Sequence, residues 1–218
     1  MVENPLTSQL ASRPAPVQRR GMLRVQAILN AADQILAEEG YEASTLGAIG
    51  KRAGIPTASV YHYFADRNQV DAALMERHSQ EIDQLVTDAA GDPALGTLSE
   101  AIDALIDPQL AYVREHPSVV ELWYAPGRSP LLMELEEAWG RAQAERLWRH
   151  LLDRGLIAAD TPLLAVEVAY EAADRVFGVA FKGSRTGDEA TIDEARRLMS
   201  AYLGTYAPQA PKTPKRRR

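Results

Sequence analysis

The sequence predicts an all-α protein built from two helical domains. Apolar residues recur at helical spacing along most of the 218 residues, whereas the alternation of a half-buried strand is rare. Clusters of Gly and Pro divide these periodic stretches into segments of helical length. We therefore expect an N-terminal three-helix domain containing a helix-turn-helix, followed by a larger C-terminal helical bundle.

Glycines and capping residues define the N-terminal helices. The aperiodic, Pro-containing segment 1–18 is expected to be disordered. Helical periodicity then stops at Gly40 and at Gly54, and Asp66 is positioned to cap the next helix. The expected helices lie at 19–39, from a Ser44 or Thr45 cap to 52, at 57–64, and at 67–90 as a connecting helix.

Breaker clusters such as "AAGDPALG" and "GSRTGD" divide the C-terminal region. We expect Pro108 to kink or split its helix and Pro162 to lie in a first turn. The expected helices lie at 97–115, 117–125, 130–155, 161–183 and 189–206. The predicted divisions of the chain are an arm at 1–18, a helix-turn-helix domain at 19–66, a helical domain at 67–207 and a disordered basic tail at 208–218.

The composition excludes several classes of protein. It is 46% hydrophobic and 25% charged, which is typical of a soluble globular chain, and no apolar run reaches the roughly 20 residues of a membrane helix. The absence of cysteine excludes disulfides and thiolate sites. The first residues lack the apolar core of a secretory signal, so a cytoplasmic protein without a membrane partner is expected.

Charge is distributed unevenly. The net charge is −6, but residues 1–80 hold 8 Lys or Arg and 8 Asp or Glu, whereas residues 81–211 hold 11 and 22. Residues 212–218 carry 5 basic residues and no acid. Only the N-terminal part and this tail avoid repulsion from a phosphate backbone. The tail is a candidate nonspecific DNA-binding arm or, alternatively, a segment that serves only solubility.

The segment 45–64 has the parts of a helix-turn-helix. Ala53-Gly54-Ile55 supplies a small residue for close helix approach, a glycine for the bend and an apolar residue for the corner. Val60 and Phe64 lie four apart and face the core, so Tyr61 lies about 100° further round the helix. The polar remainder fits a major groove. Taken alone, the tyrosines are equally compatible with covering a small core.

The stretch "TLGAIGKRAGIPTASVYHYFADRNQVDAAL" resembles the DNA-binding segment of the tetracycline-repressor (TetR) family of bacterial transcription regulators. Thr45, the turn 53–55, the run 60–64 and Arg67 match the family pattern position by position. The similarity covers about residues 19–77. The remainder is similar to the family in being all-helical and of suitable length. The resemblance implies a DNA-binding regulator with a C-terminal ligand-binding and dimerisation domain, in most relatives a repressor.

The resemblance also implies a DNA contact surface. Thr45 and Tyr61 would bond phosphates, with Arg67 adding charge, and this is physically reasonable because hydroxyls bond phosphate oxygens and methyl groups pack on thymine. Arg20 and Lys51 can contact the backbone or remain ordinary solvated charges. The predicted DNA-binding residues are Thr45, Lys51, Thr57, Ala58, Ser59, Tyr61, His62, Tyr63, Arg67 and Arg20.

The segment departs from the family pattern at two places. Pro56 stands where the family commonly has a capping Ser, so Thr57 is expected to take the cap. Gly47 and Gly50 each cost the second helix up to about 1 kcal/mol relative to Ala. Gly47 also occupies a site where some members carry a base-reading Arg, so this helix is expected to read little sequence.

The segment 161–183 has an apolar arc wide enough for burial on two sides. We expect its aromatic side to face the protomer core and its small residues to admit a partner helix; these small residues are Ala165, Ala169, Ala172, Val176 and Gly183. The resemblance implies a homodimer through helices at about 161–183 and 189–206. Two recognition helices would then bind an inverted-repeat operator in double-stranded DNA.

Large aromatic residues gather between 112 and 148, as an apolar ligand pocket requires, although plain core packing is the alternative. Candidate polar groups are Asp174, Glu121, Glu136 and Gln143. A small apolar or aromatic effector would shift the equilibrium between separations of the two DNA-binding modules away from the DNA-competent one. The connecting helix is the expected lever. The predicted ligand-binding residues are Tyr112, Trp123, Tyr124, Met133, Trp139, Trp148, Tyr170, Asp174 and Phe177.

Enzyme signatures are missing from the sequence. It has no Gly-rich phosphate loop, no Gly-x-Ser-x-Gly and no His-Glu-x-x-His. His78 and Glu81 run in the reverse order of the Glu-x-x-His pairs in di-metal bundles. We expect no catalytic residue, no metal site and no cofactor. The alternative to a regulator is a helical protein-interaction module without specific DNA binding.

Overall fold

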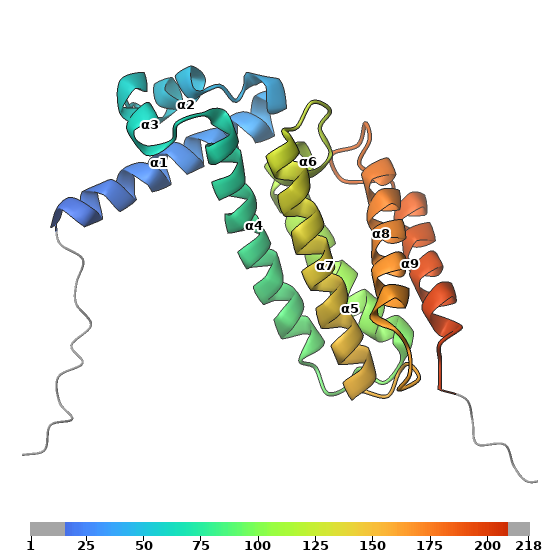
Figure 1. The fold of residues 1–218 in the computed structure, drawn as a ribbon. Helices are drawn as coiled ribbons and strands as arrows, with labels where there is room; N and C mark the ends of the chain where they lie inside the picture. Colours follow the sequence, from blue (N-terminus) through green and yellow to red (C-terminus); the bar gives the residue numbers. More distant parts are fainter. Residues whose placement is uncertain (1–15, 209–218) are drawn as a thin grey trace, which may run out of the picture.

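The computed structural model describes residues 16–208, which contain helices and no strand. Figure 1 shows α1–α3 gathered at one end of α4, and α5–α9 packed as a bundle along α4. The elements are α1 (Pro16–Glu39), the 3-10 turn η1 (Tyr41–Ala43), α2 (Leu46–Ala53), α3 (Thr57–Tyr63), α4 (Arg67–Ala90), α5 (Leu98–Glu115), α6 (Pro117–Tyr124), α7 (Pro130–Asp153), α8 (Leu163–Ala180) and α9 (Glu189–Gly204).

The helix boundaries follow the predicted caps closely. Thr45 caps α2 by accepting the Ala48 N–H at 3.2 Å, and Asp66 caps α4 by accepting the Gln69 N–H at 3.0 Å. Gly40 ends α1 with a φ of 87°. The predicted arm and basic tail lie largely outside the described residues.

Three boundaries differ from the prediction. α1 begins at Pro16 rather than at Arg19, because a first-turn proline lacks an N–H that the helix does not need there. Pro162 precedes α8 as its N-cap. Pro108 does not split α5, whose Leu105 and Leu110 stay buried on either side of it. The Gln109 side chain also donates to the Leu105 carbonyl at 2.9 Å, within the turn that the proline disturbs.

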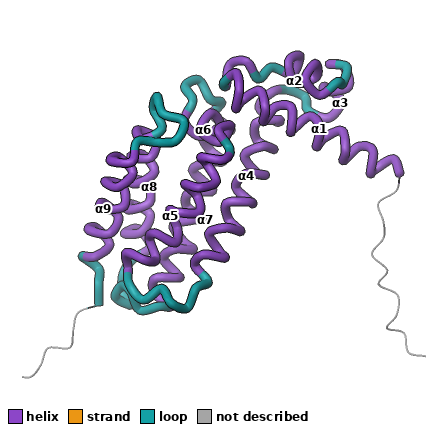
Figure 2. Tube along the Cα trace, turned by 180° about the vertical axis from the view of Figure 1, so that it is seen from behind, coloured by secondary structure: helices purple, strands orange, loops and turns teal. Residues whose placement is uncertain are grey.

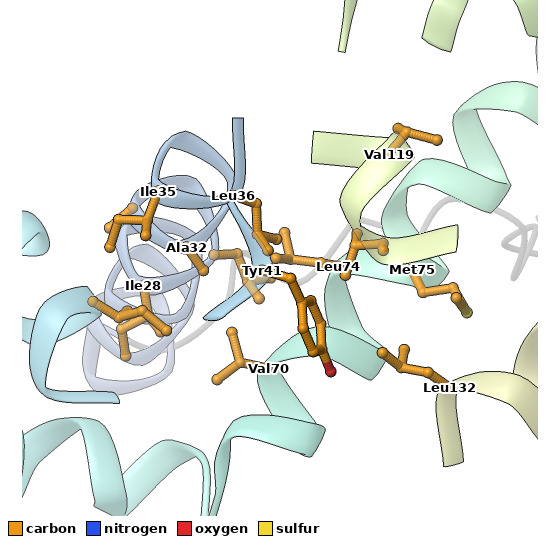
Figure 3. Close-up of a cluster of buried hydrophobic side chains, with 14 of the residues drawn as sticks. Ile28, Ala32, Ile35, Leu36, Tyr41, Val70, Leu74, Met75, Val119 and Leu132 are labelled. Carbon is orange, nitrogen blue, oxygen red and sulfur yellow. The ribbon is translucent and has the colours of Figure 1, made fainter. Parts of the chain in front are cut away.

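One hydrophobic core joins the N-terminal helices to the bundle. It begins with Ile28, Ile35 and Leu36 of α1 and continues without interruption to Leu122 of α6 and Leu132 of α7. In Figure 3 the Tyr41 ring extends from the α1 side of this cluster toward α4 and α7. The two domains therefore do not have separate cores at their boundary.

The prediction that small residues of α8 admit a partner helix is wrong for Ala165 and Ala169, which are buried within the protomer, whereas Ala172 and Val176 are half-exposed and Gly183 lies exposed beyond the helix. Ala165 and Ala169 are only 2% and 0% exposed in the single chain. Ala169 and Ala173 share a core cluster with Ala195 and Met199 of the same chain's α9. The 100° periodicity identified the strip, but the close neighbour that needs it is α9 of its own protomer.

A different face of α8 is exposed. Leu164, Val168 and Val179 are 64%, 45% and 56% exposed, and their spacing places them on one side of the helix. α8 and α9 form the edge of the bundle farthest from α4 (Figures 1 and 2). Across residues 16–208, no helix has both the length and the apolar character needed to cross a bilayer.

Candidate DNA-binding face and ligand cavity

The turn between α2 and α3 has the geometry of a Schellman motif. Gly54 adopts a φ of 66°, which only glycine enters without strain. The Ile55 N–H donates to the Gly50 carbonyl at 2.9 Å, and the Gly54 N–H donates to the Lys51 carbonyl at 3.3 Å. The end of α2 is thus satisfied internally, and the direction of α3 is fixed relative to it.

Gly50 is required by close packing, a role that its helix propensity did not reveal. A Cβ at this position would lie 2.9 Å from the Ile55 carbonyl oxygen and 3.2 Å from a Val60 methyl group. A Cβ at Gly47 would have only the Thr45 hydroxyl within 4 Å. The two glycines of α2 therefore have different consequences when replaced.

Gly50→Ala is expected to lower the free energy of unfolding by about 1–3 kcal/mol, because the Ile55 backbone must move. Gly47→Ala is the matched control, and it is expected to raise stability by up to about 1 kcal/mol through helix propensity. Urea unfolding followed by circular dichroism measures both. Equal effects of the two substitutions would contradict this account of the turn.

α3 presents a mixed polar face to solvent. Val60 and Phe64 are 0% and 8% exposed and belong to the core, whereas Tyr61 is 57% exposed. Tyr63 is half-buried against the core and meets the His62 ring edge-to-face, with centroids 5.2 Å apart. We call the exposed and half-exposed side chains of α3 the recognition face; they are Thr57, Ala58, Ser59, Tyr61, His62 and Tyr63.

The α3 cap differs from the prediction. Pro56 occupies the N-cap position and Thr57 is already the first helical residue, so no side chain caps α3. The fixed φ of proline, −54° here, suits entry into a helix. The Thr57 side chain thus stays exposed at the start of the recognition face.

Arg67 does not project toward a DNA surface, which corrects the prediction. Its guanidinium lies 3.7 Å from the centroid of the Tyr41 ring, its Nε lies 3.2 Å from an Asp71 oxygen, and its Nη2 donates to the Tyr41 carbonyl. Arg52 is likewise neutralised by Glu38 and Glu39. Lys51 and Arg20 are exposed, as expected for either a phosphate contact or a solvated charge.

Tyr41 joins the N-terminal domain to the bundle. Its N–H donates to the Glu121 carboxylate of α6 at 2.9 Å, and its hydroxyl donates to the Asp71 carboxylate of α4 at 3.1 Å. Burial raises the pKa of Asp71 to about 6, although Arg67 and the Tyr41 hydroxyl favour the carboxylate. One residue of the link between α1 and α2 is therefore bonded to two helices of the bundle.

Two further contacts cross the same boundary. His78 of α4 lies between the Asp33 carboxylate of α1, at 3.1 Å, and the Tyr112 hydroxyl of α5, at 2.7 Å. Arg185, in the α8–α9 loop, donates to the Ala37 carbonyl of α1 at 2.7 Å. His78 thus has a structural role, and within residues 16–208 no group of three or more acidic or His residues is placed to hold a metal ion.

The bundle contains two adjoining cavities. An inner cavity of about 70 Å³ lies among α4–α9, and an outer cavity of about 250 Å³ lies beside it, between the α6–α7 segment and α8. Both are lined by Trp123, Trp139, Tyr170 and Asp174, so these four side chains form the boundary that the two cavities share. Tyr124 and Phe177 line only the inner cavity, and Met133 lines only the outer one.

Two predicted ligand-binding residues lie outside these cavities. Tyr112 bonds His78 and Glu81 at the domain boundary, and the Trp148 indole donates to the Thr161 carbonyl at 2.9 Å. Of the candidate polar groups, Glu121 instead binds Tyr41, and Gln143 donates to Asp83 at 2.7 Å. Aromatic clustering along the sequence could not separate these locations.

Other lining residues were missed by the sequence prediction. The inner cavity also takes walls from α4, α5 and α9, whose contributions are apolar residues apart from Gln109 of α5. Arg128, on the outer cavity, contacts the Glu136 carboxylate and donates to the Leu122 carbonyl. The one signal that could have indicated a buried face on α5 is the helical spacing of Leu105, Ile106 and Leu110.

Comparison with known proteins agrees with this geometry. Residues 28–74 match the model of bacterial regulatory proteins of the tetR family, and residues 97–203 match the tetracyclin repressor-like C-terminal domain. The chain therefore belongs to the TetR family of transcriptional regulators, with a helix-turn-helix of the DNA-binding type.

Individual relatives extend this similarity over most of the chain. The HTH-type transcriptional regulator BetI of Stenotrophomonas maltophilia is 26% identical over 192 residues, which are 86% of this chain and 92% of that protein. A TetR-family transcriptional regulator from Streptomyces coelicolor has a TM-score of 0.64 and 29% identity, covering 84% of this chain and 99% of its own. SmeT, the repressor of the S. maltophilia multidrug efflux pump SmeDEF, shares the fold with a TM-score of 0.64 at 21% identity, covering 87% and 94%.

Proposed function

We propose that this protein is a dimeric, ligand-responsive repressor that binds an inverted-repeat operator. The observation that carries the proposal is the recognition face, a polar and methyl-bearing surface. Val60 and Phe64 pack into the core on the other side of α3, so this face is directed toward solvent. Such a surface suits major-groove contact without Lys or Arg, since hydroxyls reach phosphates and methyls reach thymine. SmeT, which shares this fold, is the repressor of an efflux pump, and repression is the regulatory role we propose for this chain as well.

The exposed face of α8 supports dimerisation. Exposed apolar residues gathered at the edge of a bundle are typical of a protein interface, and α8 presents Leu164, Val168 and Val179 there, on the side that also carries the exposed Glu171 and Arg175. α9, the other helix of that edge, also carries a partially exposed apolar residue, Leu198, at 36%. A two-fold axis through this edge would present two α3 helices for successive major grooves, which lie about 34–36 Å apart.

The cavities supply a route from ligand to DNA. Trp123 and Tyr124 line the inner cavity from α6, and Glu121 of the same helix bonds the Tyr41 N–H. A ligand that moves the end of α6 would therefore act directly on the link between α1 and α2. We propose α6 as a second lever beside α4, and the mechanism is a shift in a pre-existing equilibrium between DNA-competent and DNA-incompetent spacings.

Selection of bound duplexes from a random-sequence pool, at low and moderate salt, tests the proposal. An enriched inverted repeat whose binding weakens as salt rises is the expected outcome. A pool that stays random at both salt concentrations would contradict an operator-binding function and favour a helical protein-interaction module.

Tyr61→Phe is expected to weaken operator binding about 10-fold or more, because a hydrogen bond to a charged phosphate contributes about 1.5–3 kcal/mol. Fluorescence anisotropy with the selected duplex measures the change. The loss should be similar for operator and random duplexes, since a phosphate contact carries no sequence information. Tyr206→Phe, which removes the same hydroxyl from a residue beyond α9, is the control and should bind normally. Unchanged affinity of Tyr61→Phe would exclude the proposed hydrogen bond between the Tyr61 hydroxyl and a phosphate.

A further inference from the structure

The boundary shared by the two cavities consists largely of aromatic rings. Trp123 and Trp139 meet edge-to-face, with centroids 5.9 Å apart, and Tyr170 lines both cavities beside them. Phe177 and Tyr124 continue the wall of the inner cavity. Faces of Trp and Tyr attract cations, and the attraction grows when the cation is desolvated.

A carboxylate without a cationic partner lies at this boundary. Asp174 lines both cavities, and within residues 16–208 its one hydrogen bond comes from the Tyr124 hydroxyl at 3.3 Å. Two basic side chains of this region are committed elsewhere. Arg128 pairs with Glu136, and Arg146 pairs with Asp83 at 2.6 Å. A charge that is largely withdrawn from solvent normally has a charged partner, and within residues 16–208 no basic side chain forms an ion pair with the half-buried Asp174.

The surroundings increase the need for a positive charge. Glu136, Glu137 and Glu171 also line the outer cavity, where Arg128 is the one basic residue among the lining side chains. Burial, together with the charges of Glu136 and Glu171, raises the pKa of Asp174 to about 6, against the opposing effects of the Tyr124 hydroxyl and Arg128. The group is therefore ionised at neutral pH at a cost that a bound cation would offset.

We propose that the effector is a lipophilic monocation, with its ammonium group between Asp174 and the Trp123, Trp139 and Tyr170 rings and its apolar body in the inner cavity. This inference rests on the proposed ligand-responsive function and specifies the chemistry of its effector. A neutral apolar ligand would leave the carboxylate without compensation. An anion would meet four carboxylates against one guanidinium.

Three probes of matched shape test the charge preference: 2-phenylethylammonium, 2-phenylethanol and phenylacetate. They share a phenyl ring and a short chain and carry head groups of charge +1, 0 and −1. Binding to the full chain at neutral pH is followed by tryptophan fluorescence, since Trp123 and Trp139 line the cavities, and is confirmed by calorimetry. The ammonium is expected to bind about tenfold or more tightly than either other probe.

Asp174→Asn is expected to abolish that preference, because Asn keeps an oxygen to accept from Tyr124 but carries no charge. Asp160→Asn, an equal change at an exposed position of the α7–α8 loop, is the control and should keep the preference. The ranking of the probes on the unaltered protein is informative even if Asp174→Asn folds poorly.

Three outcomes would overturn the inference: tighter or equal binding of phenylacetate or 2-phenylethanol, retention of the preference by folded Asp174→Asn, or no saturable binding of 2-phenylethylammonium. None of these measurements contains DNA, and the duplex selection contains no probe. A failure of the charge inference is therefore distinguishable from a failure of operator binding.

Discussion

Val168→Arg combined with Val179→Arg is expected to produce a monomer that binds the operator at least about 100-fold more weakly than the unaltered protein. The two side chains are 45% and 56% exposed on the α8 face proposed as the dimer interface. Because a two-fold axis repeats each substitution in the partner, the interface would contain each new arginine twice. The exposed Arg175 of the same helix lies beside them. Like charges buried without partners cost several kcal/mol.

The loss of DNA affinity follows from the loss of the second half-site contact. Linked binding modules exceed a single module by roughly 10²–10⁴ in affinity, and each monomer would keep an intact recognition face. Sedimentation velocity measures the assembly state, and anisotropy with the selected duplex measures affinity. The expected result is a coupled loss of both.

Leu85→Arg is the matched control for the dimer experiment. Leu85 is 42% exposed, comparable to Val168, but it lies on α4 at the opposite edge of the bundle. This variant should remain dimeric and bind DNA normally. A dimer that persists in Val168→Arg/Val179→Arg would exclude this face of α8 as the interface.

Tyr41→Ala is expected to lower the free energy of unfolding by about 3–5 kcal/mol, as truncation of a buried aromatic does. The side chain is 6% exposed, and its ring packs under the Arg67 guanidinium. Its removal would also leave the buried Asp71 carboxylate without the hydroxyl donor. Urea unfolding followed by both circular dichroism and tryptophan fluorescence measures the change.

Two companion variants separate the contributions at this junction. Tyr41→Phe keeps the ring and removes only the donor to Asp71, so a loss of about 1–3 kcal/mol is expected. Tyr61→Ala, the same truncation at a 57% exposed tyrosine of α3, should change stability by no more than about 0.5 kcal/mol. Equal stability of Tyr41→Ala and Tyr61→Ala would contradict the structural role of Tyr41.

Local signals predicted the helices well because they act within a few residues. Gly54, Asp66 and Thr45 end or begin helices through bonds to neighbours three or four positions away, and each does so in the structure. The all-α fold and the TetR family assignment rest on such signals and are confirmed. The turn of the helix-turn-helix was predictable for the same reason.

Side-chain directions set by distant residues were not predictable. Arg67 turns inward because it meets Tyr41, which lies 26 residues earlier in the chain. Ala169 and Ala173 of α8 turn toward α9 of their own chain. Helical periodicity divides a helix into faces, but it does not state which neighbour covers each face.

The candidate pocket was predictable only as a region. Aromatic clustering pointed to the α6–α7 segment, and Trp123, Trp139, Tyr170 and Asp174 line both cavities. The same clustering included Trp148, whose indole instead holds the loop before α8. Composition identifies suitable side chains, whereas their convergence depends on tertiary packing.

The continuous core at the domain boundary limits how freely the recognition module can be exchanged between relatives. A chimera that received residues 16–66 from another family member would bring a foreign residue to position 41, facing this chain's Asp71 and Glu121. Position 33 would likewise have to suit His78. Operator specificity can therefore be transplanted most safely by changing only the exposed side chains of α3, which leaves every one of these boundary contacts in place.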